Sequence, residues 1–471
     1  IASGKPYTIA YEYFPDAKVP YAKTRNYDPE LDKDIETYTY TDGLDRTLQI
    51  KKTASLFTQA GSADKEAQIV SGKIIYDGLG RPIISYYPTT TTSIDNNFST
   101  ALSSVTPTET EYDETGRTIK VTLSDGSTNT TTFALENYDG LPVLRTTQTD
   151  ALNKTSQTYT DATGQNIASM HNDLVTKFET SALGEIVKVT DAMDHVIKSS
   201  YDWLGRRIEL THPDAGTSTM QYDLAGNLTT RITQDIKNTV PNGGSIQYEY
   251  NFNRLESIKY PKNPQNNVQY NYGKADGTAA RRGRLWFVQD ASGGQEFFYG
   301  KLGEIEKEIR TLRITPTDIQ TYISQYEYDT WNRIQKMTYP DGEVVEYTYN
   351  RAGNLQSMQG KKENHTYDYI KQLSYDEFEQ RKYLKYGNDT ETNYTYDPVM
   401  RRLQQLQIKS GARQVMNNSY SYDLVGNVLG IKNIAPVVNN TLGGTSNHEY
   451  QYDDFYRLKY AKATYQGEFT K

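Results

Sequence analysis

The sequence predicts an all-β protein made of tandem β-hairpins that join into one long strip of sheet. A Tyr-Asp phrase followed by Gly-Arg or Gly-Asn recurs along the chain, as in YDGLGRPI from Tyr76 and YDLVGNV from Tyr422. Tyrosine supplies 41 of the 471 residues, more than any single site could use. A phrase that returns this often marks a structural repeat rather than an active site.

One repeat can be followed from Tyr201 to Tyr222. Tyr201 ends a strand, and the carboxylate of Asp202 is placed to accept backbone N–H groups in a tight turn. Gly205 supplies the positive φ that closes the turn. The next strand runs from Arg206, and a second turn at 213–216 leads into the following Tyr-Asp phrase. The repeat is therefore a β-hairpin unit, and tyrosine suits strands with one packed and one half-wet face.

The turn residues are the candidate structural sites of the chain. They are Tyr76, Asp77, Gly80, Arg81, Tyr112, Asp113, Gly116, Arg117, Tyr201, Asp202, Gly205, Arg206, Tyr222, Asp223, Gly226, Asn227, Tyr328, Asp329, Asn332, Tyr422, Asp423, Gly426 and Asn427. Asn332 stands where glycine usually stands, and asparagine tolerates positive φ better than most residues. Met400 and Tyr456 also replace the glycine. We expect the turns without glycine to be strained or differently shaped.

Composition excludes several classes of protein. The net charge of −8 and the absence of a basic run with interleaved aromatics argue against nucleic-acid binding. Without cysteine the chain has no disulfides, thiol catalysis or thiolate metal sites. No run of 18 apolar residues exists, so we expect no membrane-spanning helix.

The repeats suggest a simple organisation. Residues 1–37 are expected to be an irregular lead-in from a preceding domain, and residues 38–471 one continuous repeat array within a longer polypeptide. The polar stretches 89–107, 237–245 and 436–446 are expected to be loops inside the array, because the phrase resumes after each of them.

These motifs resemble the Rhs/YD-repeat family over most of the chain, from about Tyr38 to about Leu458. The stretches from Gly283 to Leu312 and from Tyr38 onward are most similar to the repeat region of SpvB/TcB-type toxin-complex proteins. The resemblance implies a strip that spirals and closes into a hollow shell around a C-terminal effector. The Pro- and Gly-rich self-cleavage block of the family is absent before Lys471, so self-cleavage is carried over to no residue.

Other candidates for chemistry are weak. The five histidines are scattered singly, which favours surface positions over metal ligation. The acidic stretch 28–36 lacks the glycine of a calcium loop, so a solvated loop is favoured. The basic cluster Arg281, Arg282 and Arg284 is either exposed wall or a docking point for an acidic patch on cargo or a neighbouring subunit. We expect no catalytic residues, no metal and no cofactor.

Two functions compete on this sequence. The first is a shell segment that encapsulates a polypeptide cargo, either its own C-terminal domain or a partner toxin subunit. Other toxin-complex subunits or a secretion apparatus are the remaining expected partners. The second is an extracellular adhesion or carbohydrate-binding module exported by a bacterial secretion system. Both place the protein outside the cell or at the bacterial surface, and neither makes it an enzyme.

Overall fold

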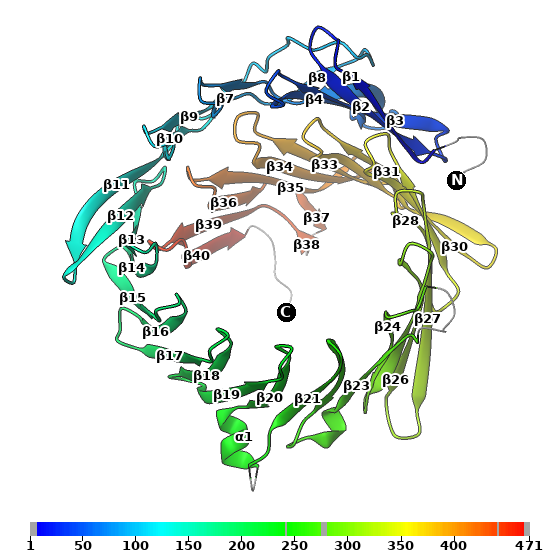
Figure 1. Cartoon of the computed structure of the whole chain (residues 1–471). Coiled ribbons are helices and arrows are strands. Elements are labelled where there is room, and N and C mark those ends of the chain that lie inside the picture. The colour runs from blue at the N-terminus through cyan, green and yellow to red at the C-terminus, as the bar shows by residue number, and fades with distance from the viewer. Residues whose placement is uncertain (1–6, 241–242, 275–279, 440–441, 466–471) are drawn as a thin grey trace.

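The computed structural model describes residues 7–240, 243–274, 280–439 and 442–465, and most of them form antiparallel strands (Figure 1). The first sheet has six strands in the order β1 (Ile9–Phe14), β2 (Tyr21–Asp28), β3 (Lys33–Thr41), β4 (Thr47–Leu56), β5 (Lys65–Val70) and β8 (Thr89–Thr91). A separate pair joins β37 (Val437–Asn439) to β38 (Leu442–Gly443).

The second sheet holds the remaining strands, each paired with the next along the chain. They are β6 (Ile74–Tyr76), β7 (Pro82–Ser85), β9 (Thr108–Tyr112), β10 (Thr118–Thr122), β11 (Thr128–Tyr138), β12 (Leu141–Thr149), β13 (Thr155–Asp161), β14 (Asn166–His171), β15 (Leu174–Thr180), β16 (Ile186–Thr190), β17 (Val196–Tyr201), β18 (Arg207–His212), β19 (Gly216–Tyr222), β20 (Leu228–Ile232), β21 (Ile246–Asn251), β22 (Arg254–Lys259), β23 (Val268–Tyr272), β24 (Leu285–Asp290), β25 (Gly293–Tyr299), β26 (Ile305–Arg313), β27 (Ile319–Tyr328), β28 (Ile334–Thr338), β29 (Val344–Tyr349), β30 (Leu355–Lys362), β31 (His365–Tyr375), β32 (Arg381–Tyr386), β33 (Thr390–Tyr396), β34 (Leu403–Ser410), β35 (Arg413–Tyr422), β36 (Val428–Asn433), β39 (Ser446–Tyr452) and β40 (Leu458–Tyr465). The predicted all-β fold of tandem hairpins is confirmed.

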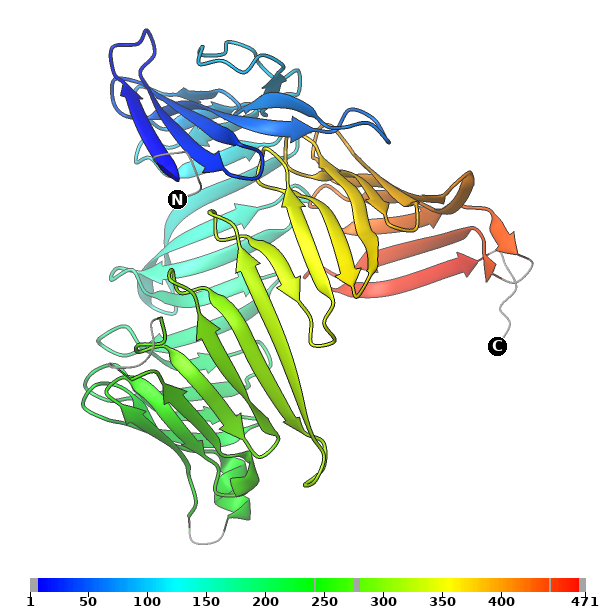
Figure 2. The same cartoon turned by 90° about the vertical axis from the view of Figure 1, so that its right-hand side faces the viewer.

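The strip of hairpins coils. Figure 1 shows it curving from the first sheet through β11, β19 and β26 and back, so that β31 to β40 come to lie near the early strands. From the side, the strip advances as it turns (Figure 2). A right-handed twist between neighbouring strands, added over many strands, produces such a coil. One edge of the strip carries the turns that follow the Tyr-Asp phrases; we call it the YD edge, and the other the opposite edge.

The expectation of an irregular lead-in over residues 1–37 is wrong where the structure describes that segment. Residues 7–37 include β1, β2 and the start of β3, and the expected boundary at residue 38 falls inside β3. Tyr21 and Tyr27 are buried. The prolines at 15, 20 and 29 lie outside the strands. Alternating tyrosines favour strands in this segment, because tyrosine has a high strand preference. The prolines lie between the strands, where no ladder hydrogen bond is needed.

In the residues that the structure describes, the three expected loops contain more regular structure than composition suggested; 241–242 and 440–441 lie outside those residues. The loop expected at 237–245 begins inside helix α1 (Gln234–Thr239), whose first turn is capped by the side chain of Thr233. The strands β37 and β38 fall within 436–446. A 3-10 turn, η1 (Pro264–Asn266), is the other helical piece in the described residues. In these residues no helix has the length and apolar character needed to cross a membrane.

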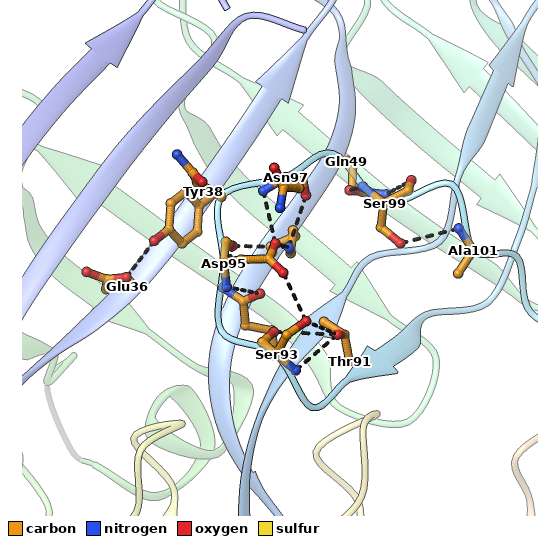
Figure 3. Close-up of polar contacts among 12 residues, drawn as sticks. Glu36, Tyr38, Gln49, Thr91, Ser93, Asp95, Asn97, Ser99 and Ala101 are labelled. Atoms are coloured by element: carbon orange, nitrogen blue, oxygen red, sulfur yellow. Dashed lines mark hydrogen bonds and ion pairs between the residues drawn. The ribbon is translucent and has the colours of Figure 1, made fainter. Parts of the chain in front are cut away.

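The loop expected at 89–107 starts with β8 and then lies as a strap across the first sheet (Figure 3). The Nζ of Lys51, only 2 % exposed, donates to the carboxylate of Asp95 at 2.7 Å and to the carbonyl of Asn97 at 3.0 Å. The amide of Gln49 exchanges hydrogen bonds of 2.9 and 3.0 Å with the backbone of Ser99. A buried ammonium is stable only with such partners, so the strap and Lys51 stabilise each other.

We expect acid or loss of Lys51 to release the strap. The hydrogen bond from Lys51 lowers the pKa of Asp95 to about 2 from an ordinary value of 3.8. Because the folded pKa is the lower one, this stabilisation is present above pH 3.8 and is lost as pH falls towards 2. An environment-sensitive dye on Ala101→Cys, in a chain without other cysteines, reports release.

At neutral pH, Lys51→Met should already give the dye signal of the released strap, which the unchanged chain gives only in acid. Lys120→Met, which removes an exposed ion pair with Glu111, should keep the signal of the bound strap. A dye signal that is the same in all three proteins at every pH would contradict the assignment.

Candidate functional site: repeat turns and winding seam

The regular Tyr-Asp phrase forms a tight turn followed by a β-bulge. In the first one of the second sheet, the N–H of Gly80 donates to the carbonyl of Asp77 at 3.0 Å, and the N–H of Asp77 donates to the carbonyl of Arg81 at 2.9 Å. Gly80 has φ of 81°, where a β-carbon would be strained. The Asp77 carboxylate accepts the N–H groups of Leu79 and Arg81 at 2.9 Å each. The sequence places these residue types in order because the three-residue hairpin loop demands them.

The arginine of the phrase holds the same carboxylate from the side. Arg81 Nε donates to Asp77 Oδ2 at 2.7 Å. The backbone N–H of Arg81, followed by its guanidinium, keeps the pKa of Asp77 below its usual range. Asp77 is therefore a charged cap of the turn and is unsuited to proton transfer near neutral pH.

The same arginine also fixes the next hairpin on the YD edge. The guanidinium of Arg81 lies 4.7 Å from the ring centroid of Tyr112, and its Nη1 donates to the carbonyl of Asp113 at 3.2 Å. The hydroxyl of Tyr112 in turn donates to the carbonyl of Pro82 at 3.0 Å. A stacked guanidinium and a satisfied phenol thus connect consecutive phrases.

This linkage recurs further along the strip. Arg206 lies 4.9 Å from the ring of Tyr222 and donates to the carbonyl of Asp223 at 2.7 Å, while the hydroxyl of Tyr222 donates to the carbonyl of Arg207 at 2.8 Å. The sequence places this arginine among the recurring turn residues, but it does not predict that the guanidinium contacts the next hairpin.

The structure places the candidate residues at equivalent positions of successive turns. The tyrosines end their strands, namely Tyr76 in β6, Tyr112 in β9, Tyr201 in β17, Tyr222 in β19, Tyr328 in β27 and Tyr422 in β35. Positive φ occurs at Gly80, Gly116, Gly205, Gly226, Asn332 and Gly426. The carboxylates of Asp113, Asp202, Asp223, Asp329 and Asp423 accept turn N–H groups. In their own turns Arg117 and Arg206, and the amides of Asn227 and Asn427, donate to these carboxylates.

The turns without glycine divide into two kinds. Asn332 and Tyr456 keep the regular hydrogen bonds with φ of 60° each, so their backbone carries the strain. At Met400 the structure differs from the expected alignment, because Arg401 adopts the positive φ of 58°. The N–H of Arg401 donates to the carbonyl of Asp397 at 3.1 Å, four residues back, so this turn is one residue longer.

The later part of the strip contacts its earlier part where the coil returns on itself. We call this line of contact, from Asp28 and Arg333 to Lys154 and Asp453, the seam. Arg333 lies between two nearly buried carboxylates, with Nε 2.6 Å from Asp329 of its own turn and Nη2 3.4 Å from Asp28 of the first sheet. The guanidinium of Arg351 donates to the carbonyl of Asp34 at 3.0 Å. These contacts join residues 305 and 317 positions apart in sequence.

Further along the chain, the seam continues with the same pairing of edges. The hydroxyl of Tyr87 donates to the carbonyl of Val399 at 2.7 Å. Tyr456 donates to the carboxylate of Asp150, and the Nζ of Lys154 donates to the carbonyl of Asp453 at 3.0 Å. In each case turns on the YD edge of the later strip meet the opposite edge of the earlier strip.

The remaining candidates show no shared site. Within the described ranges, no group of three or more histidine, aspartate or glutamate side chains could hold a metal ion. His171 lies in the seam, 3.0 Å from the carbonyl of Asp454, whereas the acidic stretch 28–36 supplies Asp28 and Asp34 to it. Arg281 is paired with Glu296 at 2.9 Å and lies 3.9 Å from the ring of Phe298, so its guanidinium is already engaged within the wall.

Comparison with known proteins agrees with this architecture. Residues 328–361 match the family model of the RHS repeat. The solved TcdB2–TccC3 structure superposes with a TM-score of 0.80 at 18% identity, over 97% of this chain and 26% of that one. A Photorhabdus luminescens Tc holotoxin pore superposes with a TM-score of 0.76 at 18% identity, over 94% of this chain and 24% of that one.

Among curated proteins, the chain is 24% identical over 256 residues to the double-stranded DNA deaminase toxin A of Burkholderia cenocepacia (strain H111). That match covers 39% of this chain and 17% of the toxin. The chain therefore spans about a quarter or less of the length of these proteins. It carries an RHS repeat at residues 328–361 and shares its fold with part of the TcdB2–TccC3 structure.

Proposed function

We propose that this RHS-repeat chain is a wall segment of a hollow shell that encloses a polypeptide cargo, such as a toxin or effector domain. The observation that carries the proposal is the seam. A strip that meets its own earlier edge about one winding later encloses space, and the contacts from Tyr27 to Lys154 run along that meeting line. The shared fold of toxin-complex proteins supports the same role.

The proposed role is steric and electrostatic. At Asp77 and Asp202 the turn's own arginine and backbone N–H groups keep the carboxyl pKa below its usual range, which supports a wall without catalytic groups or cofactors. The proposed partners are the cargo polypeptide and, in addition, other subunits of a toxin complex or a secretion apparatus. Secretion or display at the bacterial surface belongs to the proposal, because the solved neighbours are toxin assemblies.

Protease protection tests the proposal. In the native polypeptide that contains this chain, a cargo segment should resist a protease that degrades the same segment in isolation. Opening the seam with Arg333→Met should restore cleavage, whereas Gly78→Ala at an open turn position should leave protection intact. Equal cleavage of the enclosed and isolated segments would reject encapsulation. Saturable binding of the chain to a glycan array, without protection, would favour the adhesion function instead.

A further inference from the structure

One turn of the strip has a glutamate where regular phrases have the arginine that stacks on the next tyrosine. In regular phrases this guanidinium lies 4.1 to 5.8 Å from the centroid of the tyrosine ring that begins the next phrase. The pairs are Arg46–Tyr76, Arg81–Tyr112, Arg206–Tyr222, Arg254–Tyr272, Arg284–Tyr299, Arg333–Tyr349 and Arg402–Tyr422. In the turn between β25 and β26 the arginine position holds Glu304, and the next tyrosine is Tyr328.

A pocket of about 820 Å³ lies at this place, where the turn before β26 meets β27 and β28 (Figure 1). Glu304, Glu306, Tyr328 and Asp329 are among the residues that line it. The hydroxyl of Tyr328 donates to the carbonyl of Ile305 at 2.9 Å, so the ring stands in the same register as in regular phrases. The pocket therefore occupies the position that a stacked guanidinium fills elsewhere in the strip.

Two glutamate carboxylates converge at this pocket. A β-carbon built on Gly300 would lie 2.1 Å from Oε1 of Glu304 and 2.6 Å from Oε1 of Glu306. Among the residues that the structure describes, the buried Oε2 of Glu304 has no hydrogen-bond partner. Burial, and then the negative charges of these two glutamates, raise the pKa of Tyr328. A buried carboxylate oxygen without a partner is costly, so the pocket favours a cation.

Two of the three lysines that line the pocket are engaged with other groups. The Nζ of Lys336 lies 3.0 Å from a carboxylate oxygen of Glu327. The Nζ of Lys307 lies 4.9 Å from the centroid of the Phe298 ring. The third, Lys301, is an exposed residue of the turn. A cation from outside the strip can therefore approach the two glutamates.

Another glutamate at the arginine position shows how this arrangement is satisfied within the chain. Glu185 closes its turn as Glu304 does. Its carboxylate accepts a hydrogen bond from the hydroxyl of Ser181, which stands at the aspartate position of that turn. Gly300 stands at the same position in the later turn and has no side chain to donate. The later glutamate thus lacks the local donor that the earlier one has.

We propose that this pocket binds the guanidinium group of an arginine side chain from another polypeptide. The guanidinium stacks on Tyr328, as arginines of this chain stack on other phrase tyrosines, and donates to Glu304 and Glu306. Its planar, forked shape suits the ring and the carboxylates better than an ammonium group does. The site is an addition to the wall and does not depend on the enclosure of a cargo.

Ligand-observed NMR titration of the purified chain with a capped Gly-Arg-Gly peptide tests the site. We expect saturable binding of this peptide, weaker binding of its lysine analogue and none of its citrulline analogue, which has the shape of arginine without the charge. Glu304→Gln should raise the Kd by about tenfold or more, as expected for loss of a charge-assisted hydrogen bond. Glu185→Gln is the matched control, because it removes the same charge from a turn whose glutamate has its own donor.

Rebuilding the regular phrase provides a second test. Gly300→Asp combined with Glu304→Arg should supply Tyr328 with a guanidinium of its own and abolish peptide binding. The φ of Gly300 is not positive, so aspartate fits once Glu304 is gone. Unchanged hydrogen exchange in β26 to β28 would show that the variant is folded.

Three results would overturn the proposal. The first is the absence of saturable binding, or equal binding of the arginine and citrulline peptides, by the unchanged chain. The second is binding that persists in the folded, rebuilt variant. The third is an equal loss of affinity in Glu304→Gln and Glu185→Gln, which would assign the effect to overall charge. None of these results bears on protease protection of a cargo, so the two proposals fail separately.

Discussion

Replacing Arg333 with methionine is expected to open the seam. The guanidinium lies between Asp28 and Asp329, whose side chains are 3% and 4% exposed, and it stacks 4.1 Å from the centroid of the Tyr349 ring. Methionine retains much of the apolar contact but leaves two buried carboxylates without their shared cation. Breaking a buried ion pair from one side costs about 3–5 kcal/mol.

Hydrogen exchange measures this effect where it occurs, because a long strip need not unfold in one step. Amides in 27–36 and 329–355 should exchange faster by the factor that corresponds to a loss of about 3–5 kcal/mol. The exchange rates of amides near β17 to β20 should not change. Arg206→Met is the matched control. It removes the same turn contact with Asp202 and the same tyrosine stack, but its turn tip, Trp203, is exposed and lies outside the seam. Similar exchange at 27–36 in both variants would contradict a special role for Arg333.

The fold of the repeat could be predicted because its rules are local. Tyr201, Asp202 and Gly205 each make their contacts within one hairpin or with the next. The local sequence therefore specifies the turn, its bulge and the end of the strand. The same locality explains Asn332, whose backbone tolerance is a property of the residue itself. At Met400 local spacing was insufficient, since the longer turn shifted the positive φ to Arg401.

The seam could not be predicted because it depends on the accumulated twist of many strands. Asp28 and Arg333 are 305 positions apart, and nothing in either phrase distinguishes Arg333 from Arg206. The strap was missed for a related reason. Its stretch of threonines and serines is low in complexity, and its order comes from Lys51 on a distant strand. A charged residue inside an otherwise strand-like run, QIKKTA, was the available signal, because a buried lysine requires a partner.

The second large effect is expected at Gly72, where the chain passes from the first sheet to the second. A β-carbon at this position would lie 1.6 Å from the carbonyl oxygen of Tyr86 and 2.4 Å from its carbonyl carbon. Backbone atoms cannot rotate away as a side chain does, so Gly72→Ala must displace the segment at 86–87. Because Tyr87 donates to the carbonyl of Val399, the displacement should reach the seam as well.

We expect Gly72→Ala to cost on the order of 3 kcal/mol, at the upper end for forced overpacking with a backbone shift. Chemical denaturation should show the loss, and hydrogen exchange should show faster opening at 84–88 and at 397–402 together. Gly78→Ala, six residues away, is the control, since nothing lies within 4 Å of its added β-carbon and its φ is not positive. Opening at 84–88 without opening at 397–402 would separate the two sites, and would mean that the crossing at Gly72 does not support the seam through Tyr87.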